Sequence, residues 1–502
     1  MIQRVLDKLS NRFPRFAAVR KWIAMRKKRF VVGLMFVMHV LGALCSVNAV
    51  MSTRTPQGAI AWGVSLNTFP YLAVPAYLVF GQSKFDGYEL LRHQQMLSED
   101  QTDNEVVQSL REKGLLLEIE SPELRSHQIL LENLAQMPIT RANDADLLID
   151  GKQTFEAIFQ SIAKAEEYIL VQFYIMRDDE LGNRLKDALI EKAREGVRVY
   201  FLTDGLGSRK LSDAYLNQLR EAGVETAAFL TAGSGNRFRV NFRNHRKIVV
   251  VDGKEAFVGG HNVGDEYVGK HPTLTPWRDT HVGLRGPVVL ECQVSFLEDW
   301  RWASGRVPEL NWTPEAAPEG DIFGLCLPTG PADGFETGTL MLLSLINAAR
   351  ERIWIASPYF VPDEQFISAL QLAALRGVDV CVIIPENNDD SLVDLTSYSY
   401  LVELEKVGVK LFRYQPGFMH QKVMLIDNAT STIGTANFDN RSMRLNFEVT
   451  ILLYDVDFAQ KVESMLTTDL EHCRPFPASD YTESGLPFRF FVRVARLLSP
   501  VQ

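Results

Sequence analysis

Two stretches of the chain share one spacing: NHRKIVVVDGKEAFVGGHN, from Asn244 to Asn262, and HQKVMLIDNATSTIGTAN, from His420 to Asn437. In each, a histidine is followed by lysine at two residues, aspartate at seven, glycine at fourteen and asparagine at seventeen. Five residue types at identical spacing, twice in one chain, make a chance match negligible. The repeat therefore predicts two related halves, each carrying one copy of the same chemical apparatus.

The sequence ahead of each motif repeats as well. Residues 166–205 and 350–387 each contain a β-rich run, an acidic turn, an amphipathic helix ending near a glycine, and a second β-rich run. This order is typical of a βαβ unit. A coincidental α/β pattern is the alternative, because such units are common, but the shared motif spacing disfavours it. The predicted fold class is α/β: two similar domains with mixed sheets, related by a pseudo-two-fold axis, over residues 141–310 and 311–483, after a polar helical connector over 82–140.

The first part of each motif indicates its chemistry. Residues two positions apart on a strand face the same side, so His245 and Lys247 project together, and so do His420 and Lys422. A neighbouring cation disfavours protonation of the imidazole, which can then act as nucleophile or base. Two such pairs supply a double displacement at phosphorus. One histidine attacks, the other protonates the leaving oxygen, and the lysines hold the charged phosphoryl oxygens.

Asn262 and Asn437 add neutral donors, and we expect them to bind the substrate phosphate together with the lysines. A metal site is the alternative use of two histidines, but a bound cation would repel the lysines, and no cluster has ligand spacing. The five cysteines are scattered without a CxxC pair, which favours neither a thiolate site nor a disulfide framework. We therefore expect no metal and no cofactor.

The doubled HxKx4D motif with its trailing glycine and asparagine resembles that of the phospholipase D superfamily, and the likeness covers nearly everything after about residue 140. The resemblance implies metal-free catalysis through a phosphohistidine. It also implies a mainly structural part for the motif aspartates, which pin a turn. The catalytic motif residues that it implies are His245, Lys247, Asp252, His420, Lys422 and Asp427.

The family also has an acid that orients each histidine. Glu448 lies eleven residues after Asn437 and matches that pattern in the second half. Asp279 is the counterpart in the first half, although it lies seventeen residues after Asn262, so its spacing departs from the pattern. The alternative for Asp279 is a residue that caps a strand end, because aspartate favours such local bonds.

The N-terminal residues indicate a membrane anchor. Residues 1–29 hold ten Lys or Arg and one acid, and their apolar side chains fall on one helical face. Residues 30–51 and 59–81 are uncharged and each long enough to cross a ~30 Å hydrocarbon core. We expect two transmembrane helices that form a hairpin. One spanning helix followed by a buried or re-entrant segment is the alternative, because Pro70 and Pro75 interrupt the second stretch.

The resemblance narrows to bacterial cardiolipin synthases through this hairpin, through SPYFVPDEQF at 357–366 and through GTANFDNRSMRLNFE at 434–448. It implies a multi-pass protein of the bacterial inner membrane. The positive-inside rule places the basic N-terminus in the cytoplasm, and two crossings return the chain to the same side. We therefore expect the catalytic domains on the cytoplasmic side.

The same resemblance implies a reaction between phospholipids. A phosphatidyl group passes from phosphatidylglycerol to the headgroup hydroxyl of a second phospholipid, phosphatidylglycerol or phosphatidylethanolamine, and with phosphatidylglycerol gives cardiolipin and glycerol. Which histidine is the nucleophile, and the oligomeric state, stay open. The net charge of −9 and the lack of a basic stripe in the C-terminal part disfavour a nucleic-acid partner. The rivals are a membrane-attached hydrolase of lipid or nucleic acid, and a non-catalytic scaffold, which would be expected to have lost a motif histidine or lysine.

Residues 484–502 predict an amphipathic tail. In LPFRFFVRVARLLSPVQ, Leu486 to Gln502, three arginines share one helical face and apolar side chains cover much of the remainder. Such a helix is typical of an interfacial anchor that is attracted to anionic lipid. The alternative is a helix packed on the catalytic core with its arginines in solvent.

Overall fold

The structure is a computed structural model, and it describes residues 14–53, 55–81, 85, 88, 100–119, 121–229 and 241–502. The chain divides into an N-terminal unit, Met1–Lys84, and a C-terminal unit, Phe85–Gln502. The first 13 residues of the basic stretch predicted over residues 1–29 lie outside the described residues.

The described part of the N-terminal unit has one long helix and two short ones. α2 (Pro14–Ser52) contains the segment Arg29–Ser52, which among the described residues is the one helix long and apolar enough to cross a membrane. α3 (Pro56–Thr68) and α4 (Pro70–Phe80) follow it. A small apolar cluster joins the three helices, made of Ala49, Leu66, Ala73, Val74 and Tyr77.

The single helix expected over residues 59–81 is instead two helices, and that expectation was wrong. Phe69, between α3 and α4, has φ −132° and ψ 57°, outside the helical region. The cause lies in the next residue, because Pro70 has no N–H to donate and disfavours the α conformation of the residue before it. Pro75, by contrast, is accommodated inside α4. A second membrane crossing by this broken segment stays a prediction.

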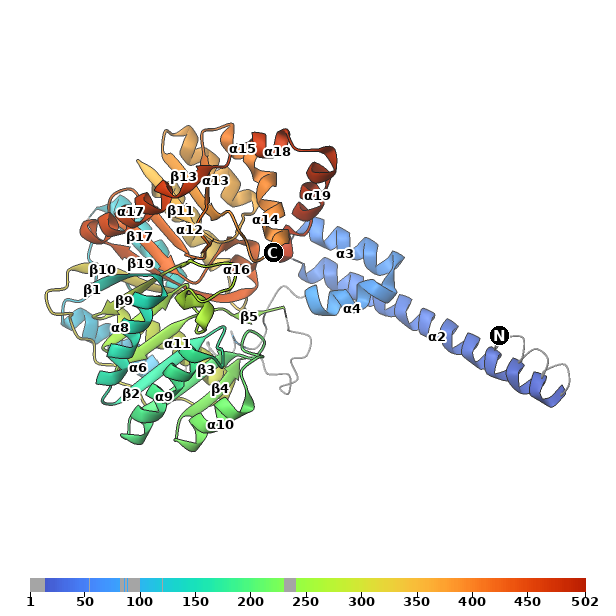
Figure 1. Cartoon of the computed structure of the whole chain (residues 1–502), viewed down its shortest axis with the longest axis horizontal. Coiled ribbons are helices and arrows are strands. Elements are labelled where there is room, and N and C mark those ends of the chain that lie inside the picture. Colours follow the sequence, from blue (N-terminus) through green and yellow to red (C-terminus); the bar gives the residue numbers. More distant parts are fainter. Residues whose placement is uncertain are drawn as a thin grey trace. The chain divides into compact units, whose positions relative to one another are not determined.

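The C-terminal unit is built on a mixed sheet in which the two halves of the chain repeat one strand order. The first half has the order β4-β3-β2-β6-β7-β9-β1, and the second has β14-β13-β11-β16-β17-β19-β10. Each strand therefore has a counterpart at the same place in the other half. β1 and β10 pair antiparallel and join both halves into one sheet. Figure 1 shows the first half in cyan to green and the second in yellow to red. The fold class predicted from the repeated motif is confirmed.

The strands of the first half are β1 (Thr140–Ile149), β2 (Tyr168–Phe173), β3 (Arg198–Asp204), β4 (Glu225–Phe229), β5 (Arg243–Asn244), β6 (Ile248–Val251), β7 (Glu255–Gly259), β8 (Trp277–Arg278) and β9 (Thr280–Arg285). Those of the second half are β10 (Ile322–Thr329), β11 (Arg352–Ala356), β12 (Phe360–Val361), β13 (Asp379–Pro385), β14 (Lys410–Tyr414), β15 (Phe418–Met419), β16 (Val423–Ile426), β17 (Thr430–Gly434), β18 (Phe438–Asp439), β19 (Asn446–Tyr454) and β20 (Cys473–Pro475).

Helices cover both faces of this sheet. Alternation along the strands divides their side chains: Ile248 and Val250 enter a core shared by both halves, whereas Val249 and Val251 enter a core belonging to the first half. α11 (Val288–Ser304) and α17 (Val456–Glu471) pack in the shared core. The opposite face is covered by α8 (Asp150–Lys164) and α9 (Glu180–Arg194) in the first half, and by α12 (Thr337–Ala348) and α13 (Glu364–Leu375) in the second.

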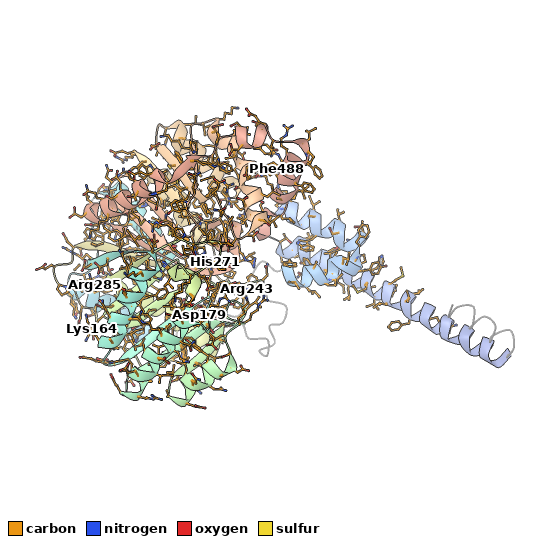
Figure 2. The ribbon with its side chains drawn as sticks, in the orientation of Figure 1. Lys164, Asp179, Arg243, His271, Arg285 and Phe488 are labelled. Atoms are coloured by element: carbon orange, nitrogen blue, oxygen red, sulfur yellow. The ribbon has the colours of Figure 1, made fainter. Side chains whose placement is uncertain are left out.

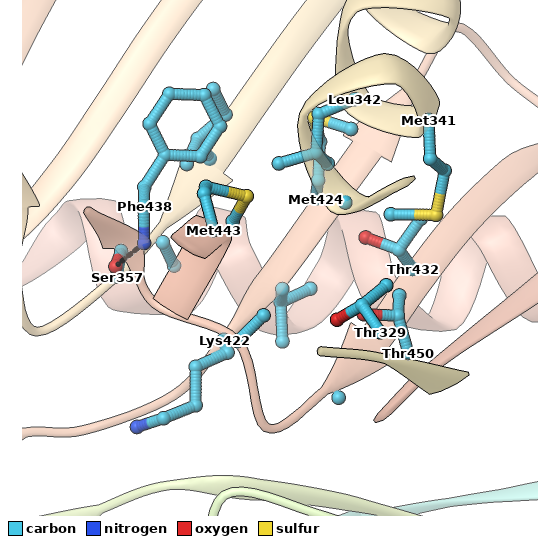
Figure 3. A pocket seen from close by; sticks show the side chains of 16 residues that line it. Thr329, Met341, Leu342, Ser357, Lys422, Met424, Thr432, Phe438, Met443 and Thr450 are labelled. Carbon is cyan, nitrogen blue, oxygen red and sulfur yellow. Dashed lines mark hydrogen bonds between the residues drawn. The ribbon is translucent and has the colours of Figure 1, made fainter. Parts of the chain in front are cut away.

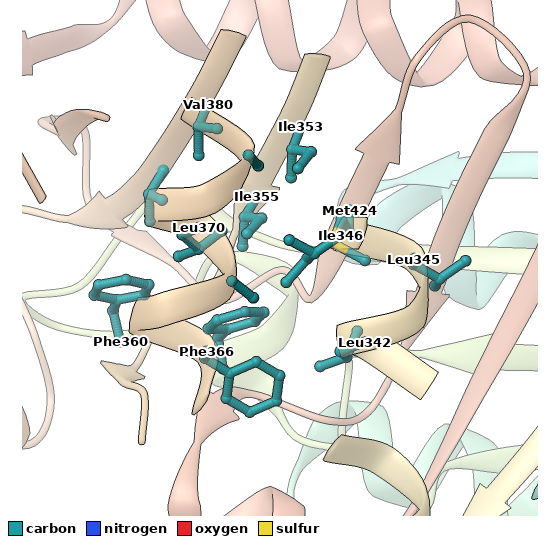
Figure 4. Packing of buried hydrophobic residues seen from close by; sticks show 14 of the residues in the cluster. Leu342, Leu345, Ile346, Ile353, Ile355, Phe360, Phe366, Leu370, Val380 and Met424 are labelled. Atoms are coloured by element: carbon teal, nitrogen blue, oxygen red, sulfur yellow. The ribbon is translucent and has the colours of Figure 1, made fainter. Parts of the chain in front are cut away.

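Figure 4 shows the second-half core, where Leu342 and Ile346 of α12 and Leu370 of α13 meet Ile353 and Ile355 of β11. Two identically ordered half-sheets with a common core hold the two motifs in a fixed mutual position.

The other described α-helices of the C-terminal unit are α6 (Asp100–Glu112), α7 (Pro122–Ala135), α10 (Asp213–Glu221), α14 (Ser391–Ser397), α15 (Leu401–Glu405), α16 (Asn440–Arg444), α18 (Ser479–Thr482) and α19 (Leu486–Arg496).

The C-terminal helix α19 turns its arginines toward the protein. Arg493 Nε donates to the Tyr481 hydroxyl at 3.0 Å, and Arg496 Nη1 donates to Glu403 Oε1 at 2.9 Å. Arg496 is therefore half-buried, whereas Arg493 stays exposed, so the alternative of arginines in solvent is wrong for Arg496 but not for Arg493. The outward side of the helix is apolar, with the exposed residues Leu486, Phe490, Phe491, Val494, Leu497 and Leu498.

Candidate active site

The two motif histidines lie just ahead of equivalent strands, β6 and β16, and each is held by backbone of the opposite half. The His245 N–H donates to the carbonyl of Phe447 at 2.9 Å. The His420 N–H donates to the carbonyl of Arg278 at 2.7 Å. Short strand pairs run beside these bonds, β5 with β19 and β15 with β8. Both imidazoles therefore lie where the halves meet, at the carboxyl ends of the parallel strands β2 and β11.

A buried carboxylate contacts each histidine, and it too comes from the opposite half. His245 Nδ1 lies 2.8 Å from Glu448 Oε2, and His420 Nδ1 lies 2.8 Å from Asp279 Oδ2. Both acids are fully buried. The structure thus places Asp279 and Glu448 where the sequence analysis expected orienting acids, with the halves exchanged. A carboxylate at Nδ1 favours the tautomer that carries its proton there, which leaves Nε2 with a lone pair.

Both histidines favour the neutral form. Burial is the largest cause and lowers the pKa of His245 to about 4, opposed by Glu448 and assisted by Lys247. Burial, followed by the cations Lys422 and Lys247, holds the pKa of His420 well below its usual range. The sequence analysis assigned this effect to the lysine alone, whereas removal from water contributes more. The charge of His245 also acts on His420, so the two imidazoles share one site.

The motif lysines lie beside their histidines. Lys247 Nζ donates to the carbonyl of His245 at 2.7 Å, and Lys422 Nζ lies 3.2 Å from His420 Nε2. Burial lowers the pKa of Lys247 to about 7 and that of Lys422 to about 8. Two buried cations at one place are costly without an anion between them. The geometry therefore suits an anionic group held between the two halves.

The motif asparagines are close to this site but are partly used by the protein. Asn262 Nδ2 donates to the Tyr267 hydroxyl at 3.2 Å, and its Oδ1 accepts the Ile175 N–H at 3.0 Å. Asn437 is 5 % exposed, and its Oδ1 has no partner in the described structure. A primary amide has two N–H groups, so each asparagine keeps donor capacity for a phosphate oxygen.

The motif aspartates lie at the far ends of β6 and β16. Asp252 accepts the backbone N–H groups of Glu166, Glu167 and Tyr168, all at 2.8 Å. Asp427 does the same for the residues that lead into β11. Both adopt positive φ, 53° and 50°, at the tight turn after the strand. Their carboxylates fix the neighbouring strand to the motif strand and do not reach the histidines.

Several residues of the site had no signal in the repeat. The Tyr174 ring centroid is 5.0 Å from that of His245, and the Trp277 centroid is 5.3 Å from that of His420. Arg246, the residue between His245 and Lys247, points into the core, where it pairs with Asp299 at 3.0 Å. Only its position in the chain could have indicated Tyr174. It directly follows β2, and active sites of α/β folds lie at the carboxyl ends of the strands.

A cavity next to the site is too small for lipid. It measures about 30 Å³ and is lined mainly by apolar side chains such as Met341, Met424 and Phe438, with Lys422 at its edge. Figure 3 shows the Lys422 ammonium directed away from it. The space holds about one water. Within the described part of the chain, no group of three or more His, Cys, Asp or Glu side chains is placed to hold a metal ion.

Comparison with known proteins agrees with this architecture. A family described as "Cardiolipin synthase, PLD-like domain", where PLD stands for phospholipase D, matches residues 158–271 and 342–470. The chain is 48% identical over 469 residues to cardiolipin synthase A of Pseudomonas fluorescens, covering 93% of this chain and 98% of that one. It is 46% identical over 476 residues to cardiolipin synthase A of Pseudomonas putida, covering 94% and 98%.

Among solved structures, the phosphatidylserine synthase of Haemophilus influenzae superposes with a TM-score of 0.59 at 15% identity. The match covers 75% of this chain and 100% of the other. At this identity the likeness concerns the fold, which is the arrangement of two half-sheets described above.

Proposed function

The chain belongs to the cardiolipin synthase family of the phospholipase D superfamily, and from that premise we propose how its residues carry out phosphatidyl transfer. The donor is phosphatidylglycerol, the acceptor is the headgroup hydroxyl of a second phospholipid, and the products with phosphatidylglycerol are cardiolipin and glycerol. One observation carries the proposal: two buried imidazoles in one site, each with Nδ1 2.8 Å from a carboxylate and with a motif lysine beside it.

The reaction proceeds in two displacements at the same phosphorus. In the first, Nε2 of one histidine attacks, a P–N bond forms, and the P–O bond to the glycerol headgroup breaks while the other histidine gives that oxygen a proton. In the second displacement, the histidine that gave the proton takes a proton from the acceptor hydroxyl. The acceptor oxygen then attacks phosphorus, the P–N bond breaks, and the nucleophilic histidine is released. His245 and His420 fill these two parts, and their order is open.

The charges of the site favour this sequence once substrate is bound. An anionic phosphodiester beside the imidazoles favours their protonated form, so it raises the low pKa of the histidine that must act as acid. The cations of Lys247 and Lys422 hold the phosphoryl oxygens, and Asn262 and Asn437 add neutral donors. Glu448 and Asp279 keep each ring in place through Nδ1.

The products distinguish this function from its rival. Purified protein in vesicles of phosphatidylglycerol is expected to release one glycerol for each cardiolipin formed. Addition of phosphatidylethanolamine tests whether it too serves as acceptor, by the mass of a mixed product. Phosphatidic acid as the main product would instead identify a hydrolase that uses water as acceptor.

The alkaline limb of the pH profile is expected to come from the lysines. A lysine is charged below its pKa, and burial lowers the pKa of Lys247 to about 7 and of Lys422 to about 8. For the free enzyme, kcat/KM should therefore fall as pH rises through about 7 to 8. It should fall at low pH where both histidines gain a proton, because neither imidazole can then attack phosphorus.

The alkaline fall of kcat should occur at higher pH than that of kcat/KM, because bound phosphate stabilises the charged lysines. Initial rates between pH 4 and 10, with fixed vesicle composition, measure both limbs. A kcat/KM that stays constant up to pH 10 would contradict the assigned part of the lysines.

We also place the catalytic unit at the cytoplasmic face of the inner membrane, with two crossings before it. The basic residues 1–29 support this orientation through the positive-inside rule. The α2 segment Arg29–Ser52 supports the first crossing. The exposed apolar side of α19, on a protein that acts on lipids, supports a second contact with the bilayer surface.

Removal of two exposed aromatic residues from α19 is expected to weaken vesicle binding. Phe490 is 65% exposed and Phe491 is 58% exposed, so the double change Phe490→Ser and Phe491→Ser removes apolar area without opening the core. We expect a severalfold lower rate on vesicles, because apolar area drives interfacial binding. The matched control is Leu375→Ser on α13, where Leu375 is 69% exposed.

Vesicle flotation and initial rates check this prediction. Equal binding by the double variant and the control would contradict it. Loss of a concentration-dependent dimer in the double variant, with vesicle binding intact, would assign the α19 surface to a second copy of the chain.

A further inference from the structure

The surroundings of the two histidines differ in charge although the fold repeats. Two residues before His245 stands Arg243, and two before His420 stands Phe418. Four residues after the motif asparagines stand Arg441 in the second half and Glu266 in the first. The repeat therefore supplies both arginines on the His245 side of the site and neither on the His420 side.

On the His420 side the two equivalent residues, Phe418 and Glu266, contact neighbouring side chains. The Phe418 ring packs on Trp277, with centroids 5.0 Å apart, and is fully buried. Glu266 pairs with Arg177 at 3.0 Å. On this side Phe418 and Trp277 form an aromatic wall, and the nearby cation Arg177 is already paired with Glu266.

On the His245 side the two guanidinium groups converge. Arg441, in α16, donates from Nη2 to the carbonyl of Asn241 at 3.0 Å and from Nη1 to Asn241 Oδ1 at 3.2 Å. Arg243 follows Asn241 by two residues and donates from Nη1 to the carbonyl of Phe242 at 2.7 Å. Burial and then the charge of Arg243 lower the pKa of Arg441. The two like charges thus lie close together.

The carboxylates nearby are engaged with other donors. Asp204 accepts three backbone N–H groups, Asp439 accepts the Ser442 N–H, and Glu448 contacts His245. In the described residues no ion pair joins a carboxylate to Arg243. Burial raises the pKa of Asp204 and brings that of Asp439 to about 6, opposed by the charge of Arg243 at Asp204 and by that of Arg441 at Asp439.

A buried donor without a partner points to the same place. Asn241 is 3% exposed, its Oδ1 is fixed by Arg441, and its Nδ2 has no hydrogen-bond partner in the described structure. An orphaned buried donor beside two guanidinium groups is the arrangement that an anion completes.

One aromatic ring connects this cluster to the reacting histidine. Burial raises the pKa of Tyr174 and the nearby charge of Arg243 opposes this shift, and the Tyr174 ring centroid lies 5.0 Å from that of His245. Arg243 is only half-buried and is labelled in Figure 2. The cluster is therefore next to the site without being part of the phosphoryl-binding pair of lysines.

We propose that Arg243, Arg441 and Asn241 form a second anion site, which binds the phosphate of the acceptor phospholipid. This inference rests on the proposed phosphatidyl transfer and names its acceptor subsite. In phosphatidylglycerol the reacting hydroxyl is separated from that lipid's own phosphate by one glycerol unit. Two phosphates must therefore lie within one headgroup length of each other during the second displacement.

The site has a consequence for selectivity. Like charges repel at this separation, so a second pair of cations lowers the barrier for a phosphate-bearing acceptor. Arginine suits this part because its planar fork binds phosphate oxygens in pairs. Water carries no phosphate and gains nothing from the site. The arginine pair therefore favours transfer over hydrolysis without acting on the first displacement.

Arg243→Gln tests the proposal through the partition of products. With full-length protein in phosphatidylglycerol vesicles, the ratio of cardiolipin to phosphatidic acid is expected to fall about tenfold or more, the effect of one lost charge-assisted bond. Arg243→Lys should give an intermediate ratio. The control is Arg285→Gln, which removes a guanidinium that pairs with Asp144 and Asp146 and should leave the ratio unchanged.

A soluble acceptor separates the phosphate from the rest of the lipid. The wild type is expected to transfer phosphatidyl groups to glycerol 3-phosphate in preference to glycerol, and Arg243→Gln should lose this preference. Arg441→Gln should act in the same direction. If it fails to fold, because Arg441 also fixes Asn241, Arg243→Gln still decides.

An unchanged product ratio and an unchanged acceptor preference in Arg243→Gln would overturn the subsite. A proportional fall of both products would overturn it too, because it would place Arg243 in the first displacement. Wild-type protein that forms no cardiolipin at all would instead overturn the proposed function.

Discussion

Replacement of either motif histidine by alanine is expected to abolish cardiolipin formation. His245→Ala removes one of the two imidazoles and His420→Ala the other, and each displacement requires both. The loss of nucleophile or proton donor should lower kcat by at least about 10³-fold. The measurement is the initial rate of glycerol release and of cardiolipin formation in vesicles.

A matched control for these two variants is His472→Ala. His472 is exposed, and in the described structure its imidazole has one hydrogen bond, to the carbonyl of Thr468 in the preceding helix. It should retain wild-type activity. Near-wild-type turnover by either motif variant would rule out a mechanism in which both histidines act on one phosphorus.

Replacement of a motif lysine should have the second largest effect. Lys247→Ala and Lys422→Ala each remove a buried cation from the place where phosphoryl charge develops, and we expect kcat/KM to fall by about 10²- to 10³-fold, as for loss of an oxyanion-hole donor. The double variant should lose less than the product of the single effects, because both groups act on one anion.

The control for the lysines is Lys254→Ala, an exposed lysine in the turn that follows the first motif. It removes the same charge from the same half of the sheet without touching the site. A change below threefold in both motif variants would contradict an anion clamp built from the two lysines.

Residues that occur twice could be predicted from the sequence, and residues that occur once could not. His245, Lys247 and their counterparts follow from strand periodicity and a repeated spacing, and so does the division into two similar halves. Tyr174 beside His245, and Arg243 and Arg441 next to the site, have no counterpart of the same type in the other half, so a comparison of the two halves does not reveal them.

The exchange of the orienting acids has a different cause. Spacing along the chain assigns Glu448 to the half of His420 and Asp279 to the half of His245, whereas in space each acid contacts the other histidine. That pairing depends on how the two half-sheets meet through β1 and β10, a long-range contact that no local pattern encodes.

The N-terminal segment shows a signal that was available in the sequence. Pro70 marks the break between α3 and α4, although hydropathy alone joins the flanking residues into one span.

In α19 the helical periodicity predicted the two faces correctly. It could not predict which face turns inward, because Arg493 and Arg496 bond to Tyr481 of α18 and Glu403 of α15, two residues outside α19.

The central claim is a covalent phosphatidyl intermediate on one motif histidine in a site built from both halves. Its most direct test is rapid quenching of the enzyme with radiolabelled phosphatidylglycerol, followed by peptide mapping. The account predicts one acid-labile, base-stable phosphatidyl adduct per chain, on His245 or on His420, and its absence from the corresponding alanine variant. An adduct on any other residue, or active enzyme with no adduct under single-turnover conditions, would contradict it.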